Sequence, residues 1–245
     1  MTGEAARPTV GIAGTGRLGA VLAARLKGRF DVLLYDTDGI AARRATEATG
    51  LPGTDADGLI IADTVLLCVP PEAMGDALLL LADRAALAGR KPLFVNLATS
   101  VPTARLRSLL ADTPGLAGID VAGLKPVCQF TALAHGVPTV FVTEATGRLA
   151  ELRHLADGLG TVVKGDESVV GPANRAATKA ALRACAQLTE ELTGRGLDPS
   201  VVRGAVRNVL AGTALDHPPS DGNPYTRSVL AELAAERTGH KGGSR

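Results

Sequence analysis

Residues 10–26 read VGIAGTGRLGAVLAARL, an apolar stretch that passes through three glycines into an alanine-rich segment. The apolar start predicts a buried strand, and the segment after the glycines predicts a helix. Gly14 permits a tight turn, Gly16 lets the backbone approach a phosphate, and Gly19 lets the helix pack closely on the strand. The stretch therefore predicts a strand–turn–helix seat for the pyrophosphate of a dinucleotide.

A second predicted strand, 31–35, ends at Asp36. A carboxylate at this point can accept hydrogen bonds from both ribose hydroxyls of NAD and would repel the 2′-phosphate of NADP. Arg43 and Arg44 follow on the next predicted helix and could reach such a phosphate. We expect a nicotinamide dinucleotide, NAD(P)(H), with a preference for NAD. The expected cofactor contacts are Gly14, Thr15, Gly16, Arg17, Leu18, Gly19, Asp36, Val69, Pro70, Ala98 and Thr99.

The pattern from residue 9 to about 165 alternates strand and helix. Strands are predicted at 9–13, 31–35, 64–69, 92–98, 118–124, 139–143 and 161–165, and helices at 17–27, 38–49, 70–88, 102–112 and 147–158. Strands that are apolar throughout and separated by helices indicate a mainly parallel sheet covered on both faces. We therefore predict an α/β Rossmann domain over residues 1–165, with a doubly wound sheet that the strand at 161–165 closes.

Beyond Asp166 the pattern is helical only. One long helix is predicted to start near Glu167 or Pro172 and to end at Gly194 or Gly196, and two more are predicted at 198–212 and 224–238. We expect a small all-helical domain over 166–238 and a disordered tail over 239–245. Three helices bury little surface on their own, so a homodimer through these C-terminal helices is expected.

Composition limits the possible functions. The 245 residues are 46% hydrophobic and 21% charged, which is enough apolar material for a folded core. A net charge of +1, four Phe, two Tyr and no Trp give no reason to expect a nucleic-acid or membrane partner. The three cysteines and four histidines lack metal-ligand spacing, so reduced thiols and no metal site are predicted. Without a long apolar run, the chain is expected to be cytoplasmic.

Several motifs together resemble the pyrroline-5-carboxylate reductase family, which is grouped with prephenate, 3-hydroxyisobutyrate and 6-phosphogluconate dehydrogenases. They are Gly11–Gly19, ADTVLLCVPPEAM (62–74), PLFVNLATSVPTARL (92–106) and the passage 171–199. The similarity in order and spacing covers residues 9–213. This resemblance implies a Rossmann domain, an all-helical C-terminal domain and a dimer whose helical domains interlock, with the active site between the two domains.

The sequence departs from the family pattern in two places. The Pro-Asn-Thr-Pro segment of those reductases is replaced by GLKPVCQ (123–129), and their serine-, proline- and glycine-rich loop is replaced by LDHPPSDGNPYTRS (215–228). In prephenate dehydrogenases a catalytic His precedes Pro at the position that resembles Lys125, and a serine lies near Thr99 or Ser100. The substrate is thus left open, while Lys125 stands at a functional position in both comparisons.

The chemistry of hydride transfer suggests which residues act on the substrate. Reducing a ketone creates an alkoxide and calls for a general acid, for which Lys125 is a candidate, whereas reducing an iminium only neutralises a cation. On the long helix, Asn174 is the first polar candidate and Lys179 the second, with Arg175 and Arg183 on the same basic face as Lys179. The expected catalytic residues are Lys125, Asn174 and Lys179.

Three further side chains lie in or near the predicted site. His217 and Tyr225 lie in the segment that matches the family poorly and could set specificity. Cys128 lies near Lys125 and is expected to be a packing residue rather than a nucleophile.

The resulting hypothesis is an NAD(P)-dependent oxidoreductase acting on a small carboxylate-bearing imine or carbonyl compound, as pyrroline-5-carboxylate reductases do. Two alternatives remain open. One is a dehydrogenase of the prephenate or hydroxyacid type that oxidises an alcohol. The other is a catalytically silent dinucleotide-binding protein that senses redox poise.

Overall fold

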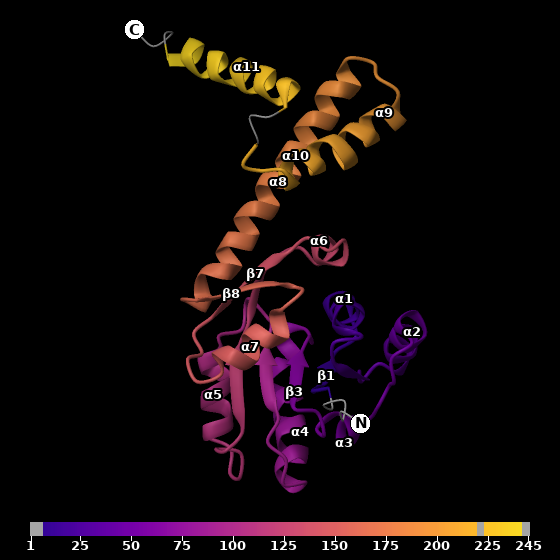
Figure 1. Ribbon diagram of the computed structural model, residues 1–245, viewed down its shortest axis with the longest axis vertical. Coiled ribbons are helices and arrows are strands. Elements are labelled where there is room, and N and C mark those ends of the chain that lie inside the picture. Colours follow the sequence, from indigo (N-terminus) through magenta and orange to yellow (C-terminus); the bar gives the residue numbers. More distant parts are fainter. Residues whose placement is uncertain (1–6, 220–222, 242–245) are drawn as a thin grey trace, which may run out of the picture. The chain divides into compact units, whose positions relative to one another are not determined.

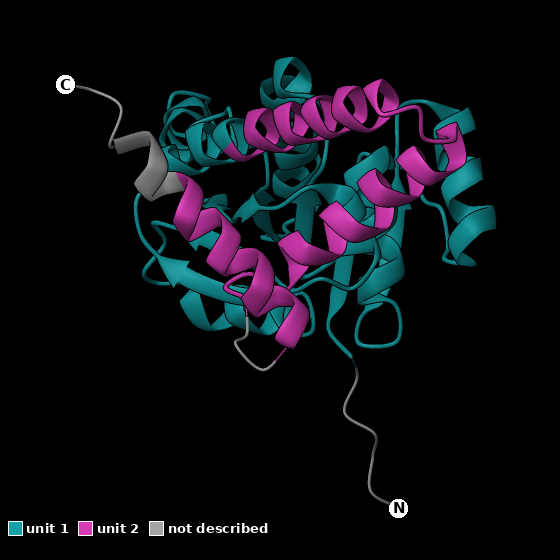
Figure 2. Ribbon diagram, turned by 90° about the horizontal axis from the view of Figure 1, so that it is seen from above, with its two compact units in different colours: residues 1–176 teal, residues 177–245 magenta. Residues whose placement is uncertain are grey.

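The structure, a computed structural model, describes residues 7–219 and 223–241 of the chain. It divides into two compact units, residues 1–176 and residues 177–245 (Figure 2). The long helix α8 (Val170–Gly194) begins in the first unit and continues in the second. Its bounds lie close to the predicted ones. No helix among the described residues is long and apolar enough to cross a membrane.

The first unit contains a five-stranded sheet in the order β2-β1-β3-β4-β5, in which every pairing is parallel. The strands are β1 (Thr9–Ala13), β2 (Asp31–Tyr35), β3 (Thr64–Leu67), β4 (Leu93–Asn96) and β5 (Asp120–Gly123). Their last residues stand side by side in register, from Tyr35 through Ala13, Leu67 and Asn96 to Gly123. The carboxyl ends of the five strands therefore form one edge, where doubly wound sheets bind their ligands.

Helices cover both faces of this sheet (Figure 1). One buried cluster joins the strands to α1 (Arg17–Leu26), α2 (Gly39–Thr49) and α7 (Leu149–Ala156). A second joins them to α3 (Ala56–Leu59), α4 (Met74–Leu87) and α5 (Thr103–Ala111). Neighbouring strand residues alternate between the clusters; Leu66 belongs to the first, and Val65 and Leu67 to the second. The Rossmann-type architecture predicted from the sequence is confirmed.

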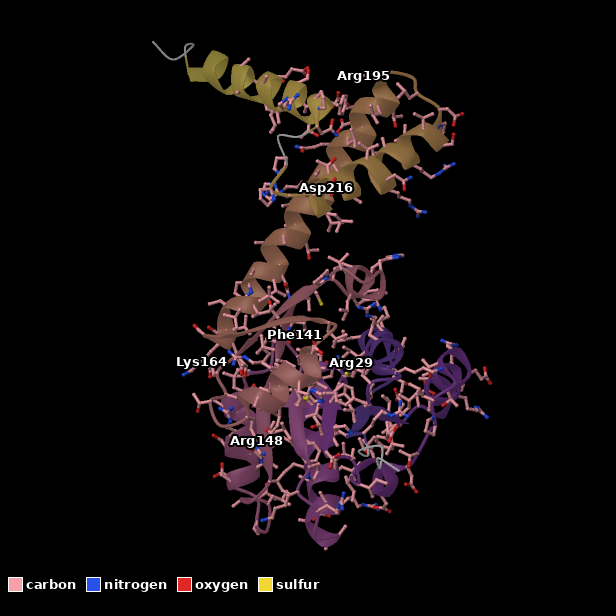
Figure 3. The ribbon with its side chains drawn as sticks, in the orientation of Figure 1. Arg29, Phe141, Arg148, Lys164, Arg195 and Asp216 are labelled. Atoms are coloured by element: carbon pink, nitrogen blue, oxygen red, sulfur yellow. The ribbon has the colours of Figure 1, made fainter. Side chains whose placement is uncertain are left out.

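A second, three-stranded sheet departs from the prediction. It is formed by β6 (Lys125–Val127), β7 (Thr139–Thr143) and β8 (Gly160–Lys164), with β6 antiparallel to β7. The expectation that residues 161–165 close a single sheet was wrong, because β8 pairs only within this smaller sheet. β6 was not predicted as a strand, since Pro126 has no amide hydrogen to donate and marks the segment as a loop. Phe141 in β7 (Figure 3) is buried.

Short elements connect the larger ones in this unit. A 3-10 turn, η1 (Pro71–Ala73), precedes α4, so the helix predicted from residue 70 begins as a tighter turn. The short helix α6 (Phe130–Ala134) follows β6 and was also not predicted. A second 3-10 turn, η2 (Glu167–Val169), leads into α8. Each 3-10 turn thus leads directly into a long helix.

The second unit is all-helical, as predicted. After α8 the chain runs through α9 (Pro199–Gly204), a π-helical segment η3 (Ala205–Leu210) and α10 (Ala211–Leu215), and ends in α11 (Pro224–Lys241). Val202 is the one buried side chain among those described in this unit. α11 extends into the predicted tail 239–245 as far as Lys241, and residues 242–245 lie outside the described residues.

Candidate cofactor site

The glycine turn after β1 has the shape that a pyrophosphate requires. Gly14 has φ +95°, and a Cβ there would lie 2.8 Å from the backbone of Cys68, so only glycine fits. A Cβ on Gly19 would overlap the carbonyl oxygen of Gly14, so the absence of a side chain at Gly19 lets α1 pack closely on the turn. Gly16, the N-cap of α1, faces open space and makes no side-chain cap. The amides of the first turn of α1 are therefore left for an anion.

Asp36 ties this turn to the end of β2. One oxygen of its carboxylate accepts hydrogen bonds from the Thr15 amide (2.6 Å) and the Thr15 hydroxyl (2.9 Å), and the other accepts from the Asp38 amide (3.0 Å). A carboxylate has lone pairs left after these bonds, so ribose hydroxyls can still donate to it. The geometry at Asp36 thus allows the predicted hydrogen bonds from the ribose hydroxyls. Arg43 and Arg44 are both exposed on α2.

Arg17 and Leu18 begin α1 next to the turn. The Arg17 guanidinium lies over the ring of Phe130 in α6, 5.3 Å from the ring centroid. This cation–π contact brings α6 beside the first turn of α1. Leu18 is half-buried and packs against the first core cluster.

Two later strand ends border the same edge of the sheet. Val69 and Pro70 follow β3, and Ala98 and Thr99 follow β4. The buried side chain of Asn96 shapes the second of these loops: its oxygen accepts from the Ala98 amide (3.0 Å), and its nitrogen donates to the Val101 carbonyl (2.9 Å). The structure therefore brings the predicted loop residues to the edge where the glycine turn lies.

Lys125 lies inside the protein, with 1% of its surface exposed. Its ammonium donates to the carbonyl oxygens of Ala98 (2.7 Å) and Val101 (3.0 Å). The carboxylate of Glu167 lies 3.9 Å from the ammonium. Burial lowers the pKa of Lys125 to about 8, although the charges of Glu167 and Glu144 oppose that shift. The lysine predicted from its position near a strand end is thus in contact with the 98–101 loop rather than with solvent.

Glu167 is a residue that the sequence analysis missed. It is 5% exposed, and its carboxylate accepts from the Thr103 hydroxyl (2.6 Å) and from the Glu144 amide (3.1 Å). A Cβ on Gly123 would overlap this carboxylate, so glycine makes the room for it. Glu167 and its partners are far apart in the sequence, and no local pattern marks the contact.

Asn174 lies near the start of α8 and is half-buried, and its side-chain nitrogen donates to the Pro126 carbonyl (3.0 Å). It therefore lies next to the segment that carries Lys125. Lys179 and Arg183 are exposed and belong to the second compact unit, and Arg175 is exposed in the first. The structure thus brings Asn174 next to the segment that carries Lys125.

The remaining candidates lie elsewhere or are inert. His217 and Tyr225 are exposed in the second unit, and residues 220–222 of the segment between them lie outside the described residues. Burial raises the pKa of the Cys128 thiol and thereby favours its unreactive, protonated form. Cys68, Cys128 and Cys185 are free thiols. Within residues 7–219 and 223–241, no group of three or more His, Cys, Asp and Glu side chains could hold a metal ion.

No family model matches this sequence, and no curated protein matches it either. Solved structures do match the fold. A pyrroline-5-carboxylate reductase from Coxiella burnetii aligns with a TM-score of 0.73 at 14% identity, over 95% of this chain and 90% of that one. This chain has the fold of those reductases. The resemblance inferred from the motifs is confirmed at the level of the fold.

Two further structures share this fold. The pyrroline carboxylate reductase of Plasmodium falciparum, solved with NADP bound, has a TM-score of 0.65 at 13% identity and covers 96% of this chain and 91% of its own. A variant imine reductase from Myxococcus stipitatus, in complex with NAD+, has a TM-score of 0.57 at 16% identity and covers 96% and 78%. At such identities the likeness concerns the fold and leaves the activity to the site itself.

Proposed function

We propose that this protein is an NAD(P)-dependent reductase that acts on a small imine bearing a carboxylate. The observation that carries the proposal is the glycine turn, where Gly14 and Gly19 admit no side chain and Gly16 faces open space. When bound there, a nicotinamide dinucleotide supplies the hydride. The first-turn amides of α1 would hold its pyrophosphate, and Ala98 and Thr99 would border its nicotinamide ribose. Two relatives by fold were solved with NADP or NAD+ bound, which supports the cofactor class.

The position of Asp36 supports NAD as the preferred cofactor. Its carboxylate is fixed at the end of β2 by Thr15 and Asp38, so it cannot easily move away from a 2′-phosphate. A fixed negative charge repels that phosphate and accepts hydrogen bonds from the free ribose hydroxyls of NAD. Titrations with NADH and NADPH test this preference, and tighter binding of NADPH would contradict it.

Imine reduction is favoured over carbonyl reduction by the burial of Lys125. A carbonyl needs a proton donor at the developing alkoxide, and the Lys125 ammonium is already bound to two backbone carbonyls and shielded from solvent. A protonated imine carries its own charge and needs no acid in the hydride step. We retain Asn174 as the candidate for direct substrate contact, and Lys179 as a second candidate that binds the substrate carboxylate.

The exposed apolar side chains of the second unit support a homodimer. They include Leu182 (65% exposed), Val209 (63%) and Leu215 (61%), and exposed apolar area of this kind is usually covered by another surface. We propose that the C-terminal helices of two copies cover each other and that the protein acts in the cytoplasm, where its three thiols stay reduced. Light scattering should report a dimer for the wild type and a shift toward monomer for Leu182→Glu. Leu87→Glu, at an exposed apolar position in the first unit, is the control and should leave the dimer intact.

Activity is tested by following the oxidation of NADH and NADPH with a panel of cyclic imino acids and keto acids, and the reverse reaction with hydroxy acids. We expect turnover with imines. Asn174→Ala should lower kcat/KM by about tenfold or more, whereas Arg153→Ala, at an exposed position of α7, should not. Turnover with hydroxy acids alone would indicate a dehydrogenase, and tight cofactor binding without turnover would indicate a silent sensor. Either result would contradict the proposal.

A further inference from the structure

Four buried polar side chains meet behind the 98–101 loop, and we name them the loop-anchoring cluster. They are Asn96 at the end of β4, Thr103 at the start of α5, Lys125 in β6 and Glu167 in η2. Each is at most 5% exposed. Asn96 donates a hydrogen bond to the Thr103 hydroxyl (3.2 Å), and that hydroxyl donates one to Glu167 (2.6 Å). Lys125 joins the cluster through its ion pair with Glu167. The cluster thus connects four elements of the first unit.

The hydrogen bonds of this cluster converge on both ends of the loop. The Ala98 carbonyl accepts from Lys125, and the Ala98 amide donates to Asn96. The Val101 carbonyl accepts from both Lys125 and Asn96. Thr99 and Ser100 lie between these two anchored residues. The loop that borders the proposed nicotinamide ribose is therefore held from behind by side chains that solvent does not reach.

The same cluster reaches the start of α8 through Glu167. Four residues after Glu167, Gly171 lies so close to the loop that a Cβ on it would be 3.2 Å from the Thr99 carbonyl oxygen. Asn174 follows on the next turn and is fixed to the Pro126 carbonyl, next to Lys125. The cluster therefore sets how the loop and the first turns of α8 lie relative to each other.

The attraction between the two buried charges is not by itself a source of large net stability. A buried ion pair of similar volume can often be replaced by apolar side chains with no loss, because desolvation of the charges offsets their attraction. What apolar side chains cannot supply is a directed hydrogen bond to each of two chosen carbonyls. The polar chemistry of the cluster is thus suited to fixing the position of the 98–101 loop.

We infer that Lys125 and Glu167 are positioning residues, which hold the 98–101 loop against the start of α8 and so place the nicotinamide end of the cofactor beside Asn174. This inference rests on the proposed function. It assigns Lys125 a part in the site that does not require the ammonium to reach the substrate, and it adds Glu167 to the site.

The test compares the affinities for NADH and ADP-ribose, which share the ADP-ribose part of the cofactor. NADH occupies the whole dinucleotide site, whereas ADP-ribose lacks the nicotinamide; NADPH and 2′-phospho-ADP-ribose form the equivalent pair. The variant is the double substitution Lys125→Met with Glu167→Gln, which removes both buried charges together and leaves neither unpaired. Lys164→Met, at an exposed lysine of β8 in the same unit (Figure 3), is the control. Affinities are measured by calorimetry and folding by circular dichroism.

The double variant should fold and bind ADP-ribose as the wild type does, while its affinity for NADH falls by about tenfold or more. Lys164→Met should change neither affinity. An unchanged NADH affinity in the folded double variant would overturn the inference, and so would a parallel loss of ADP-ribose binding. If the wild type binds neither NADH nor NADPH, the proposed function itself fails. If the double variant does not fold, Lys125→Arg is the second test, because a guanidinium can still donate to the carbonyls of Ala98 and Val101. An NADH affinity like that of the wild type then supports positioning, and a loss of NADH affinity contradicts it.

Discussion

At the glycine turn, the proposed cofactor site consists of backbone from a few neighbouring residues, closed by the carboxylate of Asp36. At the 98–101 loop, it consists of backbone that is held by side chains from β4, α5, β6 and η2. The glycine-turn end of the site depends on the absence of side chains at three glycines. The 98–101 loop end depends on buried polar side chains that are distant in the sequence. Substitutions at the two ends should therefore fail in different ways.

The largest effect is expected from breaking the buried pair at the loop end. Lys125→Met removes the donor that the buried carbonyls of Ala98 and Val101 share, which a deprotonated lysine would still supply, and it leaves Glu167 without its cation. The free energy of unfolding should fall by about 3 kcal/mol. Adding Glu167→Gln should recover part of that loss, because it removes the unpaired charge. Urea denaturation of the two single variants and the double variant measures this coupling. Additive losses would show that the two residues do not act as a pair.

At the other end, Gly16→Val should act on binding and not on folding. A Cβ on Gly16 meets no atom within 4 Å, so the fold should tolerate the side chain. The side chain would occupy the space where the pyrophosphate approaches, and the affinities for NADH and ADP-ribose should both fall by about 100-fold, roughly 2.7 kcal/mol. Calorimetry and thermal unfolding report the two quantities. A loss confined to NADH would refute the proposed place of the pyrophosphate.

The buried lysine also predicts how stability depends on pH. The pKa of Lys125 is lowered from 10.5 to about 8 in the folded state, so between these values the unfolded chain binds more protons than the folded one. The free energy of unfolding should therefore rise with pH, by about 2 kcal/mol from pH 7.5 to 9.5. The double variant Lys125→Met with Glu167→Gln should lack this contribution. An equal rise in both proteins would exclude Lys125 as its source.

The smallest effect is expected at Asp36. Asp36→Ser removes the charge that repels a 2′-phosphate but keeps a hydroxyl for the Thr15 amide. The ratio of NADH to NADPH affinity should fall by roughly fivefold, about 1 kcal/mol. Asp38→Ser is a matched control, since Asp38 caps α2 and does not contact the turn. An unchanged ratio in Asp36→Ser would show that another residue sets the cofactor preference.

The difference between the two ends also decided what the sequence alone could predict. The turn was predicted because its glycines, the strand before it and the helix after it are consecutive in the chain. Strands such as 9–13 and 31–35 followed from uninterrupted apolar runs. The long C-terminal helix was predicted to within a few residues of Val170–Gly194 because its apolar stripe has a helical period.

The loop end could not be predicted in the same way. Lys125 was predicted as a candidate from its position after a strand. Its burial depends on the pairing of β6 with β7. That pairing was not predicted, because Pro126 made the segment resemble a loop. Glu167 meets Thr103 and Lys125 only after the whole first unit has folded. The exposed positions of Lys179, His217 and Tyr225 likewise follow from tertiary structure, which a local pattern does not determine.

A crystal structure of the protein with its preferred reduced cofactor tests the account most directly. We predict that the pyrophosphate lies on the amides that follow Gly16, that the nicotinamide ribose lies against Ala98 and Thr99, and that the Lys125 ammonium stays on the carbonyls of Ala98 and Val101. A cofactor bound away from the glycine turn, or a Lys125 ammonium that leaves those carbonyls to contact the nicotinamide or the substrate, would contradict the account.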